Sequence, residues 1–324
     1  MIATYASTAD GSGPHQARSI GGRNASPRSF SDRVASLAVV ALLREAEAAP
    51  KPGLVDRFGP GSHTDMDIGH FRRSAAAIEP FFALMAENPS PVELRSLGLR
   101  AEAAMLDATG GVNTHKGAIW ALGLLCAAAA SLRGKGSPRY TDSRLNADAT
   151  CAEAARLAAG IKALPPREPS REPSRGGEAA SNGQVAKRLY GLRSAADEAI
   201  LGFPSIRSAA LPLALSLADE GRPPALRGDA VDDEDERVIL VLLAVMSVAD
   251  DTCVVARGGI AALEMARSSA KAVIAAGGPR SRDGAVAYAA MIRRFAAMGI
   301  SPGGSADLCA ATLFLAELCS RPIP

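Results

Sequence analysis

The chain has 324 residues, of which 48% are hydrophobic and 22% are charged, and its formal net charge is +2. This balance is typical of a globular protein long enough to bury a sizeable core. A charge near zero, aromatic residues at only 4% and the absence of a basic stripe argue against a nucleic-acid-binding protein.

Three features bear on the location of the protein. Residues 1–30 are rich in Gly, Ser, Ala and Arg and lack the continuous apolar core of a secretory signal, so they are expected to be a disordered leader. The longest apolar run, Val238 to Ala249, is shorter than the roughly 20 residues that a bilayer requires. Five dispersed cysteines without a CxxC pair indicate reduced thiols and a cytoplasmic protein.

From Ser31 onward the sequence predicts one helix after another. The first segment begins at Ser31 and Asp32, carries apolar residues at helical spacing and stops at Pro50. No run of alternating β-branched residues is present, so we expect an all-α fold of about ten or more helices, without significant sheet, in one domain over 31–324. Similar segments follow at 67–87, 91–109, 114–132, 146–163, 185–201, 206–220, 235–256, 260–276, 283–298 and 305–319.

One segment interrupts this pattern. Residues 165–183 contain the sequence REPS twice and are dense in Pro, Ser, Arg and Glu, so they bury too little apolar surface to offset chain entropy. They could divide two domains, but the helices on either side are alike in composition. The sequence therefore favours a disordered insertion within a single domain.

The first polar cluster lies in a long connection punctuated by Pro and Gly, "PKPGLVDRFGPGSHTDMD" (50–67). Long loops inside compact domains are usually functional or disordered. Cations and carboxylates alternate here, which suits a site that holds both metal and phosphate; the alternative is an exposed loop with Asp67 as a helix N-cap. The polar residues concerned are Lys51, Asp56, Arg57, His63, Asp65 and Asp67.

The second cluster is "GGVNTHKGAIW" (110–120), which precedes a long apolar helix. Asn113 or Thr114 can cap that helix, but capping accounts for only one polar residue. A helix N-terminus receives anions, and Lys116 adds a full positive charge. His115 can donate to a phosphate or act as an acid or base.

The third cluster is "VLLAVMSVADDTCVVARGGI" (241–260). Asp250 and Asp251 follow an apolar run, so we expect them in mid-helix among buried neighbours, where charged carboxylates need a cation. A salt bridge to Arg257 and a bound Mg²⁺ are the two alternatives.

The fourth cluster is "GISPGGSADLCAATLFLAEL" (299–318). Gly303 and Gly304 come just before a helix led by Ser305, an arrangement that can form an anion nest. Asp307 in the first turn can also simply complement the helix dipole. No GxxxxGK[ST] or GxGxxG motif occurs, so the common nucleotide-binding folds are unsupported.

Together these motifs resemble the triphosphoribosyl-dephospho-CoA synthase family. The matching pieces are "PKPGLVD", "GSHTDMD", "GVNTHKGAIW", "GFPSI", "DTCVVARGG" and "ISPGGSADLCAATLFL", in family order from about residue 37 to 319. The segment "YGLRSAADEAILGFPSI" departs from the YGxRGEA pattern of citrate-lyase-associated members and looks more like the malonate-decarboxylase-associated branch. Only Asp197 or Glu198 could replace the acidic residue of that pattern.

The resemblance implies that ATP donates its triphosphoribosyl group to the 2′-hydroxyl of dephospho-CoA, with release of adenine. An oxocarbenium-like state at C1′, a base for the hydroxyl proton and an acid for adenine are then needed. Mg²⁺ is expected on the triphosphate, with Asp250 and Asp251 as metal ligands. The catalytic candidates are His115, Asp65, Asp67 and His63. The substrate-binding candidates are Lys51, Asp56, Arg57, Asn113, Thr114, Lys116, Arg257, Gly303, Gly304, Ser305 and Asp307.

Two other functions fit parts of the sequence. A helical Mg²⁺-dependent nucleotide or ADP-ribose hydrolase would use similar Asp and His clusters, and a non-catalytic partner could deliver dephospho-CoA to an acyl-carrier protein. The resemblance itself implies that the product passes to a holo-acyl-carrier transferase system. The sequence leaves a homodimer open and does not assign the acid and the base individually.

Overall fold

The computed structural model describes residues 29–135, 144–166, 182–219 and 231–320. The expected leader lies outside these ranges except for Ser29 and Phe30, which already form the cap and first residue of a helix. The predicted insertion 165–183 also lies outside, apart from its two ends. Its last two residues, Asn182 and Gly183, are helical, so that predicted boundary was wrong.

The described residues are helical almost throughout and contain no strand; the one β-bridge, Asp56 to Gly59, closes a turn. The all-α prediction is confirmed. The elements are α1 (Phe30–Glu47), α2 (Ile68–Glu87), α3 (Pro91–Thr109), α4 (Lys116–Lys135), α5 (Ala147–Ala163), α6 (Asn182–Tyr190), α7 (Ala195–Ile200), the π-helical turn η2 (Ile206–Ala210), α8 (Leu211–Asp219), α9 (Asp233–Met246), α10 (Thr252–Ala275), α11 (Arg282–Met298) and α12 (Gly303–Ser320).

Two predicted helices are each divided in the structure. The predicted helix 235–256 breaks after Met246, and α10 begins only at Thr252, so Asp250 and Asp251 lie in a connection rather than in mid-helix. An apolar run continues across the break, and for that reason the sequence pattern did not mark it. The predicted helix 185–201 is likewise separated into α6 and α7.

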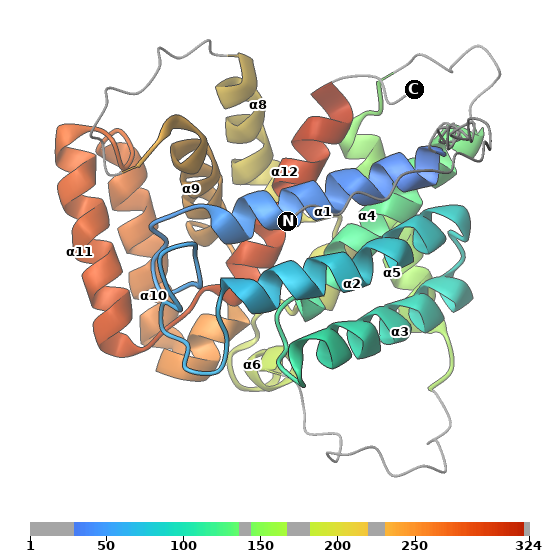
Figure 1. The fold of residues 1–324 in the computed structure, drawn as a ribbon, viewed down its shortest axis with the longest axis horizontal. Coiled ribbons are helices and arrows are strands. Elements are labelled where there is room, and N and C mark those ends of the chain that lie inside the picture. Colours follow the sequence, from blue (N-terminus) through green and yellow to red (C-terminus); the bar gives the residue numbers. More distant parts are fainter. Residues whose placement is uncertain (1–28, 136–143, 167–181, 220–230, 321–324) are drawn as a thin grey trace, which may run out of the picture.

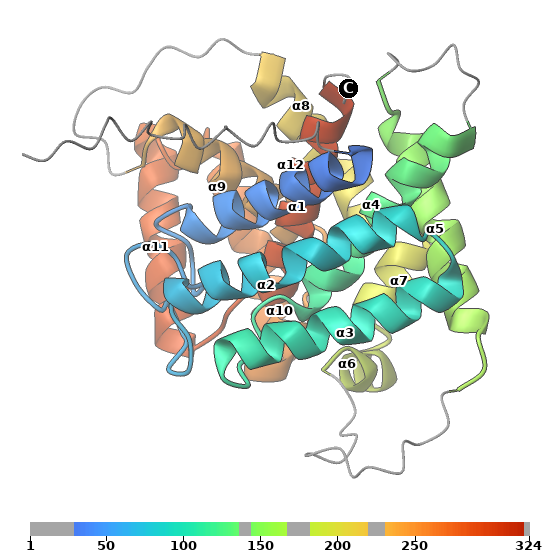
Figure 2. The same cartoon turned by 45° about the vertical axis from the view of Figure 1, so that its right-hand side comes forward.

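The helices pack in layers around α12 (Figure 1). Helices α1, α2 and α3 lie side by side, and α12 runs beneath α1 in both views (Figures 1 and 2). Helix α12 contacts α4 on one side and α9 on the other, and α10 and α11 pack together beyond α9. The N-terminal ends of α2, α4, α10 and α12 therefore converge on one region.

Helices α4 and α12 are apolar around most of their circumference, as core helices are. Within the described residues, the stretch Lys116–Gly134 alone has the length and hydropathy of a membrane-crossing helix. This stretch is longer than the apolar run Val238 to Ala249 noted from the sequence. In its most apolar window 61% of the helix is buried inside the protein, and the helix packs against α2, α5 and α12, as the core helix of a globular protein does.

Candidate functional site

A cavity of about 530 Å³ lies where these helix beginnings meet the connection 48–67. It collects residues from all four polar clusters of the sequence. The predicted site residues in its lining are Lys51, His63, Asn113, Thr114, His115, Lys116, Arg257, Gly303, Gly304 and Asp307. Residues that the sequence singled out in separate segments therefore line one cavity, although Lys51 and Asp307 are 256 residues apart in the chain.

The connection 48–67 is held against the start of the α12 segment. Gly53 has φ of +69°, and a Cβ there would lie 2.1 Å from the carbonyl oxygen of Ile300, so only glycine fits this close approach. Asp56 organises the turn by accepting hydrogen bonds from the amides of Lys51 (2.8 Å), Phe58 (2.8 Å) and Gly59 (3.1 Å). Asp56 thus shapes the loop, and it is not in the cavity lining.

Lys51 forms a buried ion pair in the cavity wall. Its side chain is 1% exposed, and its Nζ donates to Glu45 Oε1 at 2.7 Å and to the Glu45 carbonyl oxygen at 2.5 Å. Since an unpaired buried ammonium would be costly, Glu45 compensates for the burial of Lys51.

His115 turns one ring nitrogen to the protein and leaves the other without a protein partner. Its Nδ1 lies 2.6 Å from Ser74 Oγ, and the ring packs edge-on against Phe71. Its Nε2 is buried and makes no hydrogen bond. Burial and the nearby charge of Lys51 lower the pKa of His115 to about 3, so the imidazole is neutral at pH 7.

Arg257 and His63 form the more open edge of the cavity. Arg257 donates to the carbonyl oxygens of Ser62 (3.1 Å) and Gly299 (3.2 Å) and lies 3.2 Å from His63 Nδ1. His63 Nε2 lies 2.8 Å from Ser301 Oγ. Burial and Arg257 lower the pKa of His63, so this ring is also neutral at pH 7.

Asp307 projects from the first turn of α12 toward the start of α4. It accepts a hydrogen bond from the amide of Ala118, and it makes no ion pair within the described residues. A Cβ on Gly117 would lie 2.1 Å from its Oδ2, so the glycine makes room for the carboxyl group. Burial beside Glu45 and Asp251 raises the pKa of Asp307 well above its usual range. Burial therefore favours the protonated form of the Asp307 carboxyl group.

The beginning of α12 already binds a carboxyl group of the protein, that of Asp251. Asp251 Oδ2 accepts from the amide and the hydroxyl of Ser305, both at 2.7 Å, while its Oδ1 accepts from the amides of Cys253 and Val254. Burial raises the pKa of Asp251, and these four hydrogen bonds oppose that shift. The predicted anion nest at Ser305 is thus filled by a side chain, because Asp251 caps α10 and α12 together.

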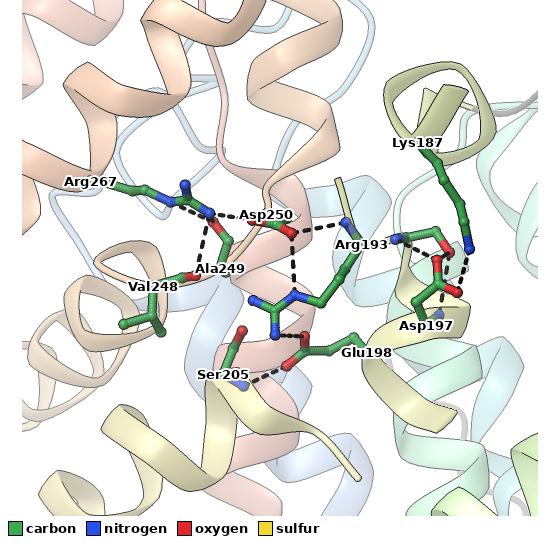
Figure 3. Close-up of polar contacts among 10 residues, drawn as sticks. Lys187, Arg193, Asp197, Glu198, Ser205, Val248, Ala249, Asp250 and Arg267 are labelled. Atoms are coloured by element: carbon green, nitrogen blue, oxygen red, sulfur yellow. Dashed lines mark hydrogen bonds and ion pairs between the residues drawn. The ribbon is translucent and has the colours of Figure 1, made fainter. Parts of the chain in front are cut away.

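Asp250 belongs to an ion-pair network next to the cavity (Figure 3). Its carboxylate accepts from Arg267 and from both the amide (2.8 Å) and Nε (3.2 Å) of Arg193. Although burial opposes ionisation, these contacts lower the pKa of Asp250. Arg193 also forms an ion pair with Glu198, with 3.6 Å between Nη1 and Oε2, and Glu198 accepts from the amide of Ser205 at 2.6 Å.

The remaining predicted residues have structural partners. Arg57 makes a bidentate pair with Asp235 outside the cavity. Asp67 caps α2 with a side chain that is 66% exposed, and Asp65 is 61% exposed and 3.6 Å from His63. At the start of α4, Asn113 accepts from the amide of Lys116 at 3.2 Å. The Lys116 ammonium pairs with Glu102 on α3 at 2.9 Å.

The carboxylates do not form a ready metal site. Within the described ranges no group of three or more His, Cys, Asp or Glu side chains could hold a metal ion. The oxygens of Asp250 and Asp251 face arginines and helix amides, so coordination of Mg²⁺ there would have to displace these contacts. The assignment of Asp250 and Asp251 as metal ligands stays a prediction, and the contacts in the structure do not favour it.

Sequence reasoning missed several residues of the site. Glu45 lies one helical repeat beyond Ala38, Ala41 and Leu42 on the buried face of α1, a pattern that could have marked it as a buried carboxylate. Ser74 and Ser301 gave no signal, because small hydroxyl residues are common everywhere. A smaller cavity of about 60 Å³ opens beside the first and shares Asp307 and Gly117 with it. It is also lined by Trp120, Arg193 and Glu198.

Comparison with known proteins gives one consistent result. The family model described as ATP:dephospho-CoA triphosphoribosyl transferase matches residues 31–322. A 2-(5′′-triphosphoribosyl)-3′-dephosphocoenzyme-A synthase of Klebsiella pneumoniae is 40% identical over 305 residues, covering 90% of this chain and 98% of the relative. Probable synthases of the same name from Pseudomonas syringae pv. syringae and Azotobacter vinelandii are 40% and 39% identical, covering 89% and 90% of this chain and 92% of each relative. No solved structure matches the chain.

Proposed function

The chain belongs to the ATP:dephospho-CoA triphosphoribosyl transferase family, and from that premise we propose that it transfers the triphosphoribosyl group of ATP to the 2′-hydroxyl of 3′-dephospho-CoA. The bond between C1′ of the ATP ribose and adenine breaks, and a bond from C1′ to the 2′-oxygen of dephospho-CoA forms. Adenine departs with one proton, and the hydroxyl proton released by the acceptor replaces it, so that no net proton is gained or lost. The product is the prosthetic-group precursor of an acyl-carrier subunit.

The observation that carries this proposal is that one cavity gathers cationic groups, N–H groups and a carboxyl group from distant segments. Lys51, His115 and Arg257 come from three different segments and offer positive charge or N–H groups to a polyanion. Asp307 lines the same cavity and makes no ion pair within the described residues. The transferred group needs both kinds of partner, because it has a triphosphate at one end and a leaving base at C1′.

Asp307 is the group that we propose as the general acid. Burial raises the pKa of Asp307 and so favours the protonated carboxyl group, from which a proton can pass to adenine as the bond to C1′ breaks. The resulting carboxylate then lies beside the developing positive charge of the ribose. Acid catalysis of this kind contributes typically about 10²–10⁴-fold to a rate.

Mg²⁺ enters the proposal with the triphosphate. Such ions are usually bound by one or two carboxylates together with substrate phosphates, rather than by a cage of protein ligands. Glu45 and Asp307 are the two carboxyl groups in the lining of the larger cavity, but Glu45 is paired with Lys51 and Asp307 is the proposed acid, so the substrate phosphates would supply most of the ligands. When bound, the ion would neutralise phosphate charge, while Lys51 and Arg257 orient the phosphates.

We assign the other predicted residues by their contacts. His63 and Asp65 were catalytic candidates of the sequence; His63 lines the open edge of the cavity with Asp65 beside it, and we propose that it binds the acceptor there. Asp56, Arg57 and Asp67 hold the loop and the start of α2, and we give them no chemical step.

Further proposals concern the setting of the enzyme. The segment "YGLRSAADEAILGFPSI" supports service to malonate decarboxylase rather than citrate lyase, with the product passed to a holo-acyl-carrier transferase system. Dispersed free cysteines support a cytoplasmic enzyme. We keep the single transferase domain over 31–324 as a proposal, and the homodimer is settled by measuring the mass of the protein in solution.

The test is to incubate the protein with ATP, Mg²⁺ and dephospho-CoA and to measure free adenine and the mass of the product. Release of adenine only when both substrates are present supports the transferase. Ribose products without dephospho-CoA would support a hydrolase, and no turnover would support a binding partner. Asp307→Asn is the matched variant, because it keeps the size of the side chain and removes the acid.

A further inference from the structure

Ser74 and His115 form a buried pair that the proposed reaction does not yet use. Ser74 lies on α2, fully buried, and its Oγ is 2.6 Å from His115 Nδ1. Thr114 Oγ1 approaches the same nitrogen at 3.4 Å. Two hydroxyl groups therefore converge on one side of the ring, while Nε2 on the other side is buried and without a partner.

The Ser74 hydroxyl group determines which group is the donor in its hydrogen bond with His115 Nδ1. In the part of the chain that the structure describes, His115 Nδ1 is the one hydrogen-bond partner of the Ser74 hydroxyl. If Nδ1 carried the proton and donated it, the Ser74 hydrogen would be left buried without an acceptor, which is costly. If Ser74 donates to Nδ1, its hydrogen is satisfied and the ring proton must lie on Nε2.

The surroundings keep the ring neutral as well as oriented. Phe71 packs edge-on against it, and Met105 Sδ accepts from the His115 amide at 3.2 Å, so the ring is fixed from α2 and α3. The ammonium of Lys51, supported by Glu45, opposes a second positive charge nearby. The other ionisable groups in the cavity lining are His63, Lys116, Arg257 and Asp307.

We propose that Ser74 is a positioning residue that holds His115 in its neutral tautomer with the proton on Nε2. His115, a residue of the cavity lining, then carries its unpartnered N–H on Nε2 and is a donor at that atom instead of a base. The chemistry that such a donor recognises is an anionic oxygen of the substrate. This last step rests on the proposed function, in which a phosphate oxygen of ATP is the acceptor, whereas the tautomer itself does not.

The deciding experiment is imidazole ¹⁵N NMR of the free, full-length protein labelled at histidine, between pH 5 and 8. The chain has four histidines, and His115→Gln identifies the signals of His115 by their loss. We expect a neutral ring protonated at Nε2 across this range. In Ser74→Ala we expect a mixture of the two tautomers. A His115 ring protonated at Nδ1, or on both nitrogens at pH 7, would overturn the proposal.

Kinetics provide a second readout. Ser74→Ala should lower kcat for adenine release about five- to tenfold, the worth of one hydrogen bond. His115→Gln, which can place an amide N–H near the Nε2 position, should retain more activity than His115→Asn. The matched control is Ser247→Ala, another buried serine, whose Oγ donates to the Ala244 carbonyl at 2.8 Å away from this cavity.

The two kinds of failure are distinguishable. A wild-type protein that releases no adenine contradicts the proposed function, and the NMR result still decides the tautomer. Unchanged tautomer and unchanged kcat in Ser74→Ala would remove Ser74 from its positioning role, whatever the reaction is.

Discussion

The carboxylate of Asp251 and the first turn of α12 at Ser305 are joined by two hydrogen bonds of 2.7 Å, although 54 residues separate them. The other oxygen of the same carboxylate caps α10. One side chain thus accepts hydrogen bonds from the beginnings of two helices that line the proposed active site.

Replacing Asp251 should therefore destabilise the fold. Asp251→Asn keeps one acceptor but turns an NH₂ group toward the Ser305 amide, so a cap is weakened and a buried donor is unpaired. We expect the free energy of unfolding to fall by about 2–4 kcal/mol, measured by urea denaturation. Asp67→Asn is the control at an exposed cap, where Asn is as good as Asp and the change should stay below about 0.5 kcal/mol. An Asp251→Asn protein with wild-type stability but altered Mg²⁺ dependence would instead favour the metal assignment.

The contributions of Asp250 and Arg267 to stability should depend on each other. Arg193 and Arg267 both bind its half-buried carboxylate, so the double-mutant cycle of Asp250→Asn and Arg267→Gln should give a coupling energy of about 1–2 kcal/mol. Urea denaturation of the four proteins measures it. Additive losses would mean that the ion pair does not stabilise the fold, and would leave Asp250 available for another cation.

Gly117→Ala tests the position of Asp307 without touching the carboxyl group. The added Cβ would lie 2.1 Å from Asp307 Oδ2 and must displace it, so adenine release should fall about 100-fold. Gly98→Ala on α3 is the matched control, since nothing lies within 4 Å of its Cβ and helix propensity favours Ala. Equal activity of the two variants would argue against Asp307 as the acid.

His115 should make the protein sensitive to acid. Its pKa of about 3 in the folded state lies below the ordinary 6.5 of the unfolded chain, so the unfolded state binds a proton first as the pH falls. The wild type should lose stability relative to His115→Gln by about 1.4 kcal/mol per pH unit below pH 6.5, down to about pH 3. Urea midpoints of both proteins from pH 7 to 5 measure this difference. A constant difference would mean that the ring titrates with the same pKa in the folded and the unfolded state.

Residues 167–181 should be dispensable. They carry none of the motifs shared with the family, and each doubling of loop length costs only about 0.6 kcal/mol. Replacement by a short Gly/Ser linker that keeps Pro165, whose carbonyl accepts from Arg95 at 2.7 Å, should leave kcat for adenine release within about twofold. Loss of turnover in a folded deletion variant would place part of the site in this segment.

The sequence alone determined the all-α fold and the position of most helices, because helix periodicity and caps are local properties, but it missed the breaks within 185–201 and 235–256. The predicted segment 91–109 matches α3. Asp67 is the N-cap of α2, which was one of the two alternatives that the sequence left open for this residue. Family motifs also pointed to His115, Lys51, Arg257 and Asp307, which the structure brings to one cavity.

Only the tertiary structure decided which partner each charged side chain has. An aspartate after an apolar run looks the same whether it binds a metal, an arginine or a helix start, since its partner lies far away in the sequence. Asp250 pairs with Arg193 and Arg267, Asp251 accepts from Ser305, and Asp307 has no ion-pair partner in the part of the chain that the structure describes. Long-range packing decides which carboxyl groups the protein itself pairs, and this difference is the basis of the role that we propose for Asp307.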